Sequence, residues 1–310
     1  MVREKKRRPL RTALTVILII VLLIAAAAPF FIAYSVMAGG KRSTLDEKME
    51  EQSKIYDTSF YYDLDKTDYT VEGYEGYVLH VEFLKNPEET DRYVIITHGY
   101  SSNRIGTLRY VPMYLDLGFN CIIYDLRGHG ENERTITTYG TLEGEDLVRL
   151  IADTRERYDV QVLGLQGESL GAATTVSALK AEPDVDFAVA DCGFSDIEGV
   201  LRGGCHLMHV PEFLVDAADF GAKVLYGYSL KQMRPIDALD NNTVPILFMH
   251  GEEDYFIPPE NSARMYERTA GVKEFHEIPG AGHAQSMFTE PEMYKDIVRS
   301  FLEGIGVGGR

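Results

Sequence analysis

Cysteine is scarce in this sequence, and repetitive or low-complexity segments are missing from it. Only three cysteines occur in 310 residues, at positions 121, 192 and 205. This small, odd number does not support a disulfide framework, although a single bridge between Cys192 and Cys205 stays open. Because no internal repeat or low-complexity tract is found, repeat architectures are excluded. The sequence is therefore expected to form a globular fold that does not depend on a disulfide framework.

Basic residues are also sparse beyond the N-terminus. Residues 1–11 contain six Lys or Arg, whereas the whole chain has 31 basic and 48 acidic residues and a net charge of -17. Such an acidic body repels polyanions, so no nucleic-acid partner is expected. With 45% hydrophobic residues, a chain of this length can build one large α/β domain.

A long apolar run lies near the N-terminus. From Ala13 to Ala33 the chain is almost wholly apolar, and about twenty such residues can cross a bilayer as a helix. The preceding basic residues predict, by the positive-inside rule, that the C-terminal body lies outside the cytoplasm. They are Arg3, Lys5, Lys6, Arg7, Arg8 and Arg11. We expect a single-pass cell-membrane protein anchored by residues 1–40; a secreted protein with a cleaved signal peptide is the alternative.

Short apolar segments alternate with helical ones through the rest of the chain. Residues 41–57 predict a charged linker or short surface helix, and residues 58–310 predict the main domain. Antiparallel strands at Phe60–Leu64 and Gly76–Leu84 are expected to open its sheet. Buried parallel strands are predicted to start near Arg92, Cys121, Val160, Phe187, Pro245 and Lys273. Helices at 142–155 and 262–269 would cover this sheet.

The most informative motif is Gly167-Glu168-Ser169-Leu170-Gly171. It joins the predicted strand from Val160 to a predicted helix that begins at Ala172. A serine on so sharp a turn needs neighbours two residues away with almost no side chain. Its hydroxyl would project at the N-terminus of the helix, where backbone N–H groups can stabilise an oxyanion. Ser169 is therefore the candidate nucleophile.

An acid and a histidine follow further along the chain. Asp254 stands just beyond the strand that starts at Pro245, and His283 ends the turn Gly280-Ala281-Gly282-His283 after the last predicted strand. Serine, acid and histidine therefore occur in the chain order of α/β-hydrolases, which differs from that of other serine hydrolase folds.

Two more motifs, His98-Gly99 and Arg127-Gly128-His129-Gly130, complete the set. With them the sequence resembles the α/β-hydrolase superfamily over residues 70–305, in particular bacterial membrane-anchored serine hydrolases related to esterases, monoacylglycerol lipases and S33 serine aminopeptidases. The resemblance implies an α/β fold with a mostly parallel eight-stranded sheet flanked by helices. It also implies a helical cap inserted at about 195–235, whose inner apolar side would favour an acyl or aryl group.

The residue types predict an acyl-enzyme mechanism. His283 would take the proton of Ser169, while Asp254 would hold the imidazole in the required tautomer. The backbone N–H of Leu170 would supply one oxyanion donor, and by resemblance that of Tyr100 would supply the other. The supporting loops would be shaped by His98, Gly99, Gly167 and Gly171.

Several alternatives stay open at this stage. Glu252, Glu253 and Asp196 compete with Asp254 for the role of the acid. His129 is expected to shape a loop rather than to carry a proton. Cys205 and His209 fall one helical turn apart, but no further ligand cluster accompanies them, so neither a metal nor a cofactor is expected.

The function predicted from these residues is a serine hydrolase, of carboxylesterase or lipase type, that cleaves esters of small or medium acyl groups. An aminopeptidase or amidase would use the same three residues. A membrane-displayed binding protein that has lost turnover is the alternative from another class. The sequence leaves the natural substrate and the oligomeric state open.

Overall fold

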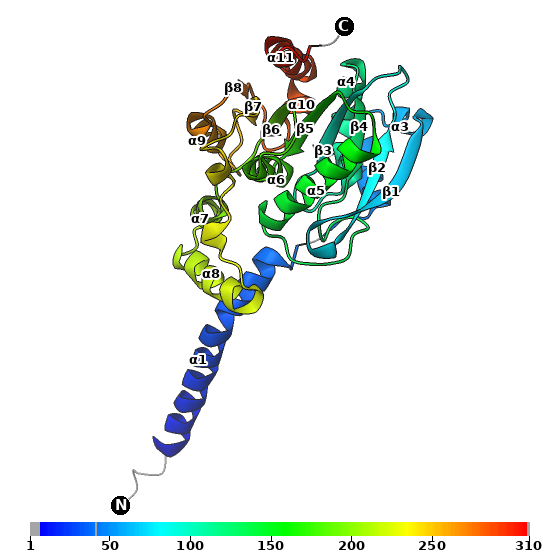
Figure 1. Ribbon diagram of the computed structural model, residues 1–310. Helices are drawn as coiled ribbons and strands as arrows, with labels where there is room; N and C mark the ends of the chain where they lie inside the picture. The colour runs from blue at the N-terminus through cyan, green and yellow to red at the C-terminus, as the bar shows by residue number, and fades with distance from the viewer. Residues whose placement is uncertain (1–6, 41, 309–310) are drawn as a thin grey trace, which may run out of the picture.

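A computed structural model describes residues 7–40 and 42–308 of the chain. A rounded body contains a twisted sheet covered by helices, and one long helix, α1, projects from it (Figure 1). The helices are α1 Arg7–Met37, α2 Leu45–Ser53, α3 Phe60–Asp63, α4 Val111–Asp116, α5 Thr141–Arg157, α6 Leu170–Ala178, α7 Ile197–Leu207, α8 Phe213–Tyr226, α9 Glu260–Arg268, α10 Ser286–Thr289 and α11 Pro291–Gly304.

Eight strands form one sheet in the order β1-β2-β4-β3-β5-β6-β7-β8. β1 pairs with β2, and β2 with β4, in antiparallel fashion, whereas every other neighbouring pair is parallel. The predicted mostly parallel, eight-stranded sheet is confirmed. Its strands are β1 Lys66–Glu72, β2 Val78–Leu84, β3 Arg92–Thr97, β4 Asn120–Tyr124, β5 Val162–Glu168, β6 Phe187–Asp191, β7 Ile246–Gly251 and β8 Lys273–Ile278.

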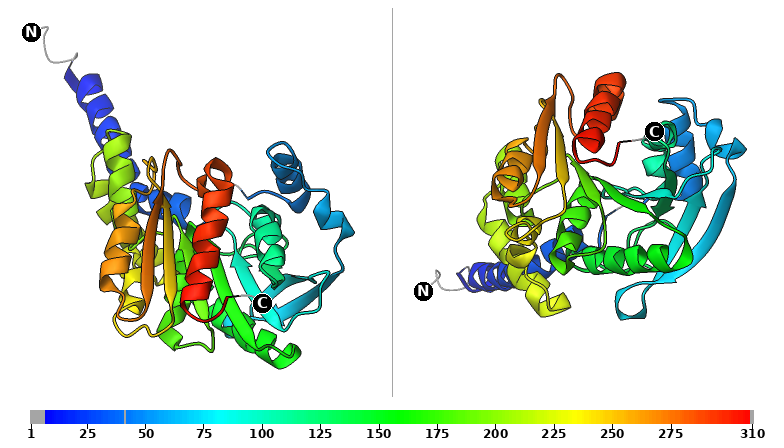
Figure 2. Two further views of the ribbon diagram at one scale, coloured as in Figure 1. Left: turned by 90° about the horizontal axis from the view of Figure 1, so that it is seen from above. Right: turned by 45° about the horizontal axis from the view of Figure 1, so that its top comes forward.

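Helices cover both faces of the sheet, as two views of the body show (Figure 2). Alternate residues of a strand point to opposite faces. In β3, Ile95 therefore joins a core cluster with residues of α5, α6 and α9, while Val94 and Ile96 join a second cluster with residues of α4 and α11. This double cover explains why the central strands are continuous apolar runs rather than alternating ones.

The first predicted strand, Phe60–Leu64, is wrong. Phe60–Asp63 forms the single helical turn α3, and the sheet opens instead with β1 at Lys66. Aromatic enrichment favoured a strand, but here Phe60, Tyr61 and Leu64 pack together against the core cluster beside α4. A four-residue turn is too short to show a helical period in the sequence.

The segment between the apolar run and the main domain contains α2. Its N-terminus carries a capping box, in which the Thr44 side chain accepts from the Glu47 N–H and the Glu47 side chain accepts from the Thr44 N–H. Asn103 fastens the start of this helix to the body, because its amide donates to the carbonyl oxygens of Ser43 and Thr44. Residues 42–57 are therefore partly ordered against the main domain.

The helix α1 is long and apolar enough from Arg11 to Met37 to cross a membrane. Its C-terminal part is fixed to the body, since Ala33 and Met37 are fully buried and the Tyr139 hydroxyl donates to the Val36 carbonyl at 2.6 Å. Arg3, Lys5 and Lys6, which contribute to the predicted orientation, lie outside the described residues. The apolar composition of α1 agrees equally with an anchor and with a signal sequence.

The insertion between β6 and β7 forms the helices α7 and α8. The resemblance implied a helical cap with an apolar inner side, but most of the large apolar side chains of this segment are exposed. Exposed side chains include Leu207, Met208, Val210, Phe213, Phe220, Val224 and Leu225. Small residues of α8, including Gly221 and Ala222, take the inward position, because α8 packs closely on α1. Cys192 and Cys205 are both free thiols, so the bridge between them is not formed.

Candidate functional site

The turn from β5 into α6 holds Ser169 in a strained conformation. Its backbone angles are φ 55° and ψ -112°, a region that residues other than glycine rarely adopt. The flanking glycines explain how the turn closes. A Cβ on Gly167 would lie 2.2 Å from the Gly171 oxygen, and one on Gly171 would lie 2.2 Å from the Thr97 oxygen. Only glycine fits at either position without moving the backbone.

The structure brings Ser169, His283 and Asp254 together from three separate loops. The Ser169 Oγ lies 3.0 Å from the His283 Nε2, and the His283 Nδ1 lies 2.7 Å from the Asp254 Oδ2. Because an ionised carboxylate only accepts hydrogen bonds, the His283 Nδ1 carries the proton. The Nε2 of the neutral ring is then free to accept the serine hydroxyl proton. These are the geometric relations that a nucleophile and its base require.

Asp254 is buried yet held in its ionised form. Burial alone would raise its pKa, but hydrogen bonds from His250, His283 and the Ile257 N–H outweigh that effect and bring the pKa well below its ordinary value. The Oδ1 accepts the backbone N–H groups of Phe256 and Ile257 at 3.0 and 2.9 Å. The fixed negative charge can therefore stabilise an imidazolium at His283.

The competing acids lie elsewhere. Asp196 caps α7, where its side chain accepts from the Gly199 N–H at 2.7 Å and from the Ser195 hydroxyl at 2.9 Å. Glu252 and Glu253 are exposed on the turn that precedes Asp254. None of these three carboxylates hydrogen-bonds to His283 among the described residues, so Asp254 is the only one of the four acid candidates that does so.

Two backbone donors flank the serine. Leu170 is the first residue of α6, so its N–H lies at the positive end of the helix and has no acceptor within that helix. Tyr100 follows the His98-Gly99 pair beyond β3, and Ser101 next to it has φ 57°. A Cβ on Gly99 would meet the Ser169 Cβ at 3.5 Å, so this loop runs directly alongside the serine.

His98 and His129 are buried and have structural surroundings. The His98 Nδ1 donates to the Gly99 oxygen at 2.8 Å, and its Nε2 accepts from the Leu126 N–H at 3.0 Å. Burial lowers the pKa of His98 to about 4 and that of His129 to about 3. Both rings are therefore neutral at physiological pH, and His98 ties the loop after β3 to the loop after β4.

Sequence reasoning missed a buried ionic network behind the serine. The Glu168 carboxylate pairs with Arg109 at 2.9 Å, and Arg109 also donates to the Ala284 oxygen at 3.0 Å. Ala284 follows His283 directly, so this guanidinium links the turn that carries the nucleophile to the loop that carries the histidine. Ser286 adds a second link, because its hydroxyl lies 3.2 Å from Asp191 at the end of β6. Glu168 stands at a position of the serine motif where any residue is allowed, so the motif did not predict a role for it.

The Arg109–Glu168 pair is expected to matter for stability. Arg109→Met should lower the free energy of unfolding by about 3–5 kcal/mol, because it leaves a buried carboxylate without its partner. The double variant Arg109→Met/Glu168→Gln should lose less than Arg109→Met alone. Urea unfolding in detergent solution measures both. Lys54→Met, which breaks an exposed pair with Glu50, is the control and should change stability by less than about 1 kcal/mol.

Two carboxyl groups in this network share one hydroxyl. The Tyr110 hydroxyl lies 2.9 Å from Glu168 and 3.1 Å from Asp191, but it has a single hydrogen to donate. The second contact needs a proton from one of the carboxyl groups. Burial first, and the nearby Glu168 charge second, raise the pKa of Asp191 to about 6. Asp191 is therefore the group that holds the proton under mildly acidic conditions.

This raised pKa predicts a pH dependence of stability. An unfolded aspartate has a pKa of about 3.9, so between about pH 4 and 6 the folded chain holds a proton that the unfolded chain has lost. Asp191 stabilises the fold fully below about pH 4, and that contribution is lost as the pH rises through about 6. The difference in unfolding free energy between wild type and Asp191→Asn should change by about 3 kcal/mol across this range. Asp91→Asn, at an exposed position, should run parallel to wild type.

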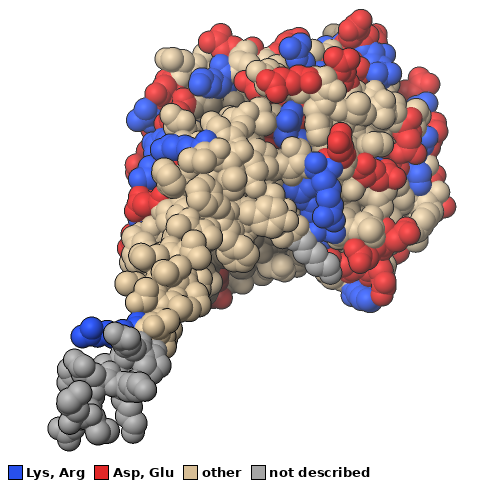
Figure 3. Space-filling view, turned by 90° about the horizontal axis from the view of Figure 1, so that it is seen from below, with Lys and Arg blue, Asp and Glu red and all other residues tan. Residues whose placement is uncertain are grey.

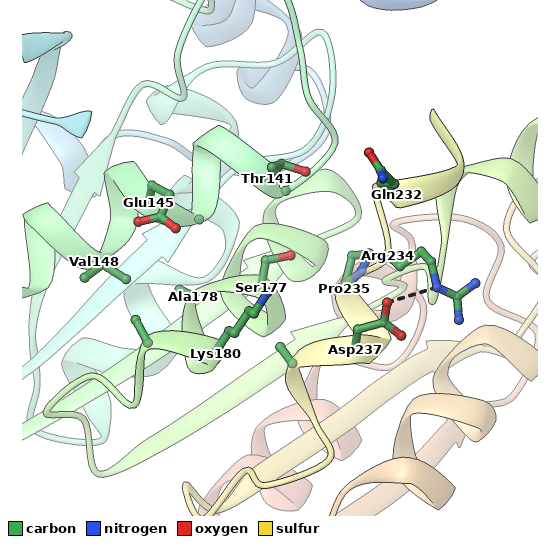
Figure 4. Close-up of a pocket in the computed structure, with 14 residues that line it drawn as sticks. Thr141, Glu145, Val148, Ser177, Ala178, Lys180, Gln232, Arg234, Pro235 and Asp237 are labelled. Carbon is green, nitrogen blue, oxygen red and sulfur yellow. Dashed lines mark hydrogen bonds and ion pairs between the residues drawn. The ribbon is translucent and has the colours of Figure 1, made fainter. Parts of the chain in front are cut away.

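A polar cleft lies at the far end of α6 (Figure 4). It is lined by residues of α5 and α6 and by the segment around the short helix Pro235–Ala238, where Arg234 pairs with Asp237 at 3.0 Å. Ser177, which lines it, stands eight residues beyond Ser169, or about 12 Å along the helix. Ser169, Asp254 and His283 do not line this cleft. Among the described residues no group of three or more His, Cys, Asp or Glu is placed to hold a metal ion.

Comparisons with known proteins concern the family and the fold of the chain. The prolyl oligopeptidase family matches residues 107–303. The uncharacterized protein YqkD of Bacillus subtilis is 30% identical over 84% of this chain and 81% of its own length. The α/β-hydrolase domain-containing protein WAV2 of Arabidopsis thaliana is 24% identical over 74% of this chain and 76% of its own. The solved esterase Pf2001 of Pyrococcus furiosus superposes with a TM-score of 0.67 at 22% identity, over 79% of this chain and 93% of its own.

Proposed function

The chain belongs to the prolyl oligopeptidase family of α/β-hydrolases, and we propose that it is a serine hydrolase that cleaves carboxylic esters of small or medium acyl groups. The observation that carries this proposal is the unbroken line of hydrogen bonds from Ser169 through His283 to Asp254. Membership of this family supports a hydrolase. The three residues supply its nucleophile, its base and the acid that orients the base.

The proposed reaction has two halves. The Ser169 Oγ attacks the ester carbonyl carbon while the His283 Nε2 takes the hydroxyl proton, and the same nitrogen then protonates the departing alkoxide to give the free alcohol. Water next attacks the acyl-enzyme, and His283 takes its proton and returns one to Ser169 as the acid leaves. The backbone N–H groups of Leu170 and Tyr100 stabilise the oxyanion in each tetrahedral intermediate.

An aminopeptidase is the second candidate, since the matched family includes oligopeptidases by name. A substrate amine would need an unpaired carboxylate near the nucleophile. Glu168, the carboxylate adjacent to Ser169 in the chain, is engaged by Arg109 and by the Tyr110 hydroxyl. Glu168 is therefore not available to receive a substrate amine.

The helix α1 completes the proposal as a membrane anchor. The span Arg11–Met37 has the length and composition to cross a bilayer. Basic residues at its N-terminal side favour a catalytic domain outside the cytoplasm. Protease treatment of intact cells should digest the domain without lysis. Digestion only after lysis would reject this orientation.

The substrate class is tested by turnover of two matched series of chromogenic compounds. We expect p-nitrophenyl esters to be cleaved much faster than aminoacyl p-nitroanilides, with a preferred acyl chain length among the esters. Faster turnover of the anilides would replace the esterase proposal with the aminopeptidase. Turnover of neither series, together with no labelling by a fluorophosphonate, would support a binding protein that has lost activity.

A further inference from the structure

The helix α8 turns its large apolar side chains outward and its small residues toward the body, which is the opposite of an ordinary surface helix. Its buried residues are small or charged, namely Ala218, Asp219, Gly221 and Ala222 together with Val215. Its large apolar side chains face outward, with Phe213 66% and Val224 58% exposed. Phe213, Phe220 and Val224 are spaced by seven and four residues, so they form one stripe along the helix. Such a contiguous exposed stripe marks a contact with an apolar environment.

This stripe is continuous with the apolar surface of α1. The rings of Phe220 and Phe30 lie 6.2 Å apart, and a Cβ on Gly221 would fall 2.2 Å from the Pro29 oxygen. α8 therefore packs backbone to backbone against the outer part of α1. Seen from below, an uncharged surface runs from this helix onto the body without a break, and charged side chains gather around its edge (Figure 3).

The length of α1 indicates the depth in the bilayer at which α8 contacts it. If Arg11 marks the inner edge of the hydrocarbon, about 30 Å at about 1.5 Å per residue ends near Phe31. Pro29 and Phe30, which α8 touches, thus lie at the outer edge of the hydrocarbon. Tyr34, 53% exposed, lies one turn further out, at the level where aromatic side chains are enriched in membrane proteins.

Because α8 touches α1 at the outer edge of the hydrocarbon and shares its apolar surface, we propose that α8 and the turn before it lie in the outer interface of the lipid bilayer. They would form a second membrane contact beside α1. The proposal rests on the proposed anchor. Phe213, Phe220 and Val224 enter the acyl region to a depth of several ångströms, as the apolar face of an interfacial helix does. Leu207, at the end of α7, and Met208, on the turn that leads to α8, are exposed as well.

The charges of α8 fit an interfacial position. Asp216 and Lys223 lie beside the stripe on the side of the helix away from Gly221, at the level of the head groups. Each is paired, since the Lys231 ammonium lies 2.7 Å from Asp216 and Lys223 lies 2.7 Å from Asp219. Paired charges at the head-group level do not have to be desolvated, so only the apolar stripe enters the lipid.

The candidate active site lies close to this membrane surface. Tyr139, whose hydroxyl bonds the Val36 carbonyl of α1, stacks on Tyr100 with ring centres 6.2 Å apart. Tyr100 is the residue proposed to donate its N–H to the oxyanion. An acyl ester dissolved in the bilayer would thus reach Ser169 near the point where α1 leaves the lipid, which assigns membrane-partitioned acyl esters as the substrate class.

Depth-dependent quenching in lipid vesicles tests the proposal with the full chain. Single cysteines at Phe213→Cys and Val224→Cys are labelled with an environment-sensitive fluorophore, and the protein is reconstituted in phosphatidylcholine with or without brominated acyl chains. We expect blue-shifted emission and strong quenching at both positions. Val272→Cys is the matched control, because Val272 is a valine with 57% exposure next to β8, and its label should not be quenched. Unsubstituted protein gives the background from the three buried native thiols.

Leu18→Cys, on α1, separates the possible failures. A quenched label at position 18 with unquenched labels at 213 and 224 would overturn the proposal and leave the anchor standing. An unquenched label at position 18 would remove both the anchor and the proposal. Disulfide cross-linking between copies at position 213 without quenching would assign the stripe to a dimer interface and would also overturn it. None of these results depends on turnover, so they are distinct from a failure of the esterase proposal.

A charge in the stripe tests the substrate class. Val224→Asp should lower hydrolysis of a vesicle-borne medium-chain ester several-fold while hydrolysis of soluble p-nitrophenyl acetate is unchanged. Val272→Asp should leave both rates as in wild type. Equal rates of Val224→Asp and wild type on the vesicle-borne ester would contradict delivery of substrate from the membrane.

Discussion

Ser169→Ala is expected to abolish turnover. Removal of the nucleophile in an assembled triad typically costs about 10⁴- to 10⁶-fold in kcat, because the remaining oxyanion donors accelerate only the direct attack of water. The loss should be equally complete on any ester, since the acyl-enzyme cannot form without the Oγ. Ester hydrolysis and labelling by a fluorophosphonate measure the same event in two ways, and both should disappear.

Ser177→Ala provides the matched control, on the same helix but beside the polar cleft rather than beside His283. This variant should keep both labelling and turnover. If Ser169→Ala were still labelled by the fluorophosphonate, another side chain would be the activated nucleophile. The proposal that Ser169 carries the reaction would then be wrong, even though the fold and the family would stand.

Local sequence was sufficient to locate the serine turn. Gly167 is required within the turn itself, because an added Cβ would lie 2.2 Å from the Gly171 oxygen, whereas Gly171 is required by the Thr97 oxygen on the neighbouring strand. Parallel strands were equally readable, because burial on both faces makes each of them a short apolar run. Their carboxyl ends meet at one edge of the sheet, so residues that follow β5, β7 and β8 can converge there. Ser169, Asp254 and His283 lie there within hydrogen-bonding distances of each other.

Contacts between distant segments could not be predicted from the sequence. Arg109 precedes α4, Glu168 ends β5 and Ala284 follows β8, and nothing local in any of them signals the other two. The outward stripe of α8 was misread for a similar reason. Its periodicity indicated an apolar face, but only the packing of Gly221 on Pro29 decides which way that face points. Periodicity defines a face and leaves the partner of that face open.

Two buried carboxyl groups near the site have pKa values shifted in opposite directions. Asp254 accepts three hydrogen bonds, from His283 and two backbone N–H groups, and its Oδ2 lies 3.2 Å from the His250 Nε2. Its pKa is lowered. Asp191 lies near another carboxylate, and its pKa is raised to about 6. Burial opposes the charge on both groups, so the number and charge of their partners decides the outcome. This difference suits Asp254 to stabilise a cation and Asp191 to a structural role.

Asp254→Asn is therefore expected to give the second large loss. An asparagine can keep the contact with His283 by donating its amide, and this would turn the imidazole to the wrong tautomer, with the proton on Nε2. That nitrogen could no longer accept the Ser169 proton. The expected reduction in kcat is about 10⁴-fold, with much less change in KM, because the binding surface is left in place.

Glu253→Gln is the matched control, since it neutralises the neighbouring carboxylate, which is exposed and lies outside the hydrogen bonds of His283. It should retain turnover close to wild type. A pH profile adds a second readout: Asp254 contributes stability above the pKa of an unfolded aspartate, about 4, and this is lost as the pH falls through its lowered native value. Asp254→Asn should lack this acid-side loss. Similar kcat values for Asp254→Asn and Glu253→Gln would show that His283 does not depend on Asp254, and the acid would have to be sought at Asp196, which caps α7 in the present conformation.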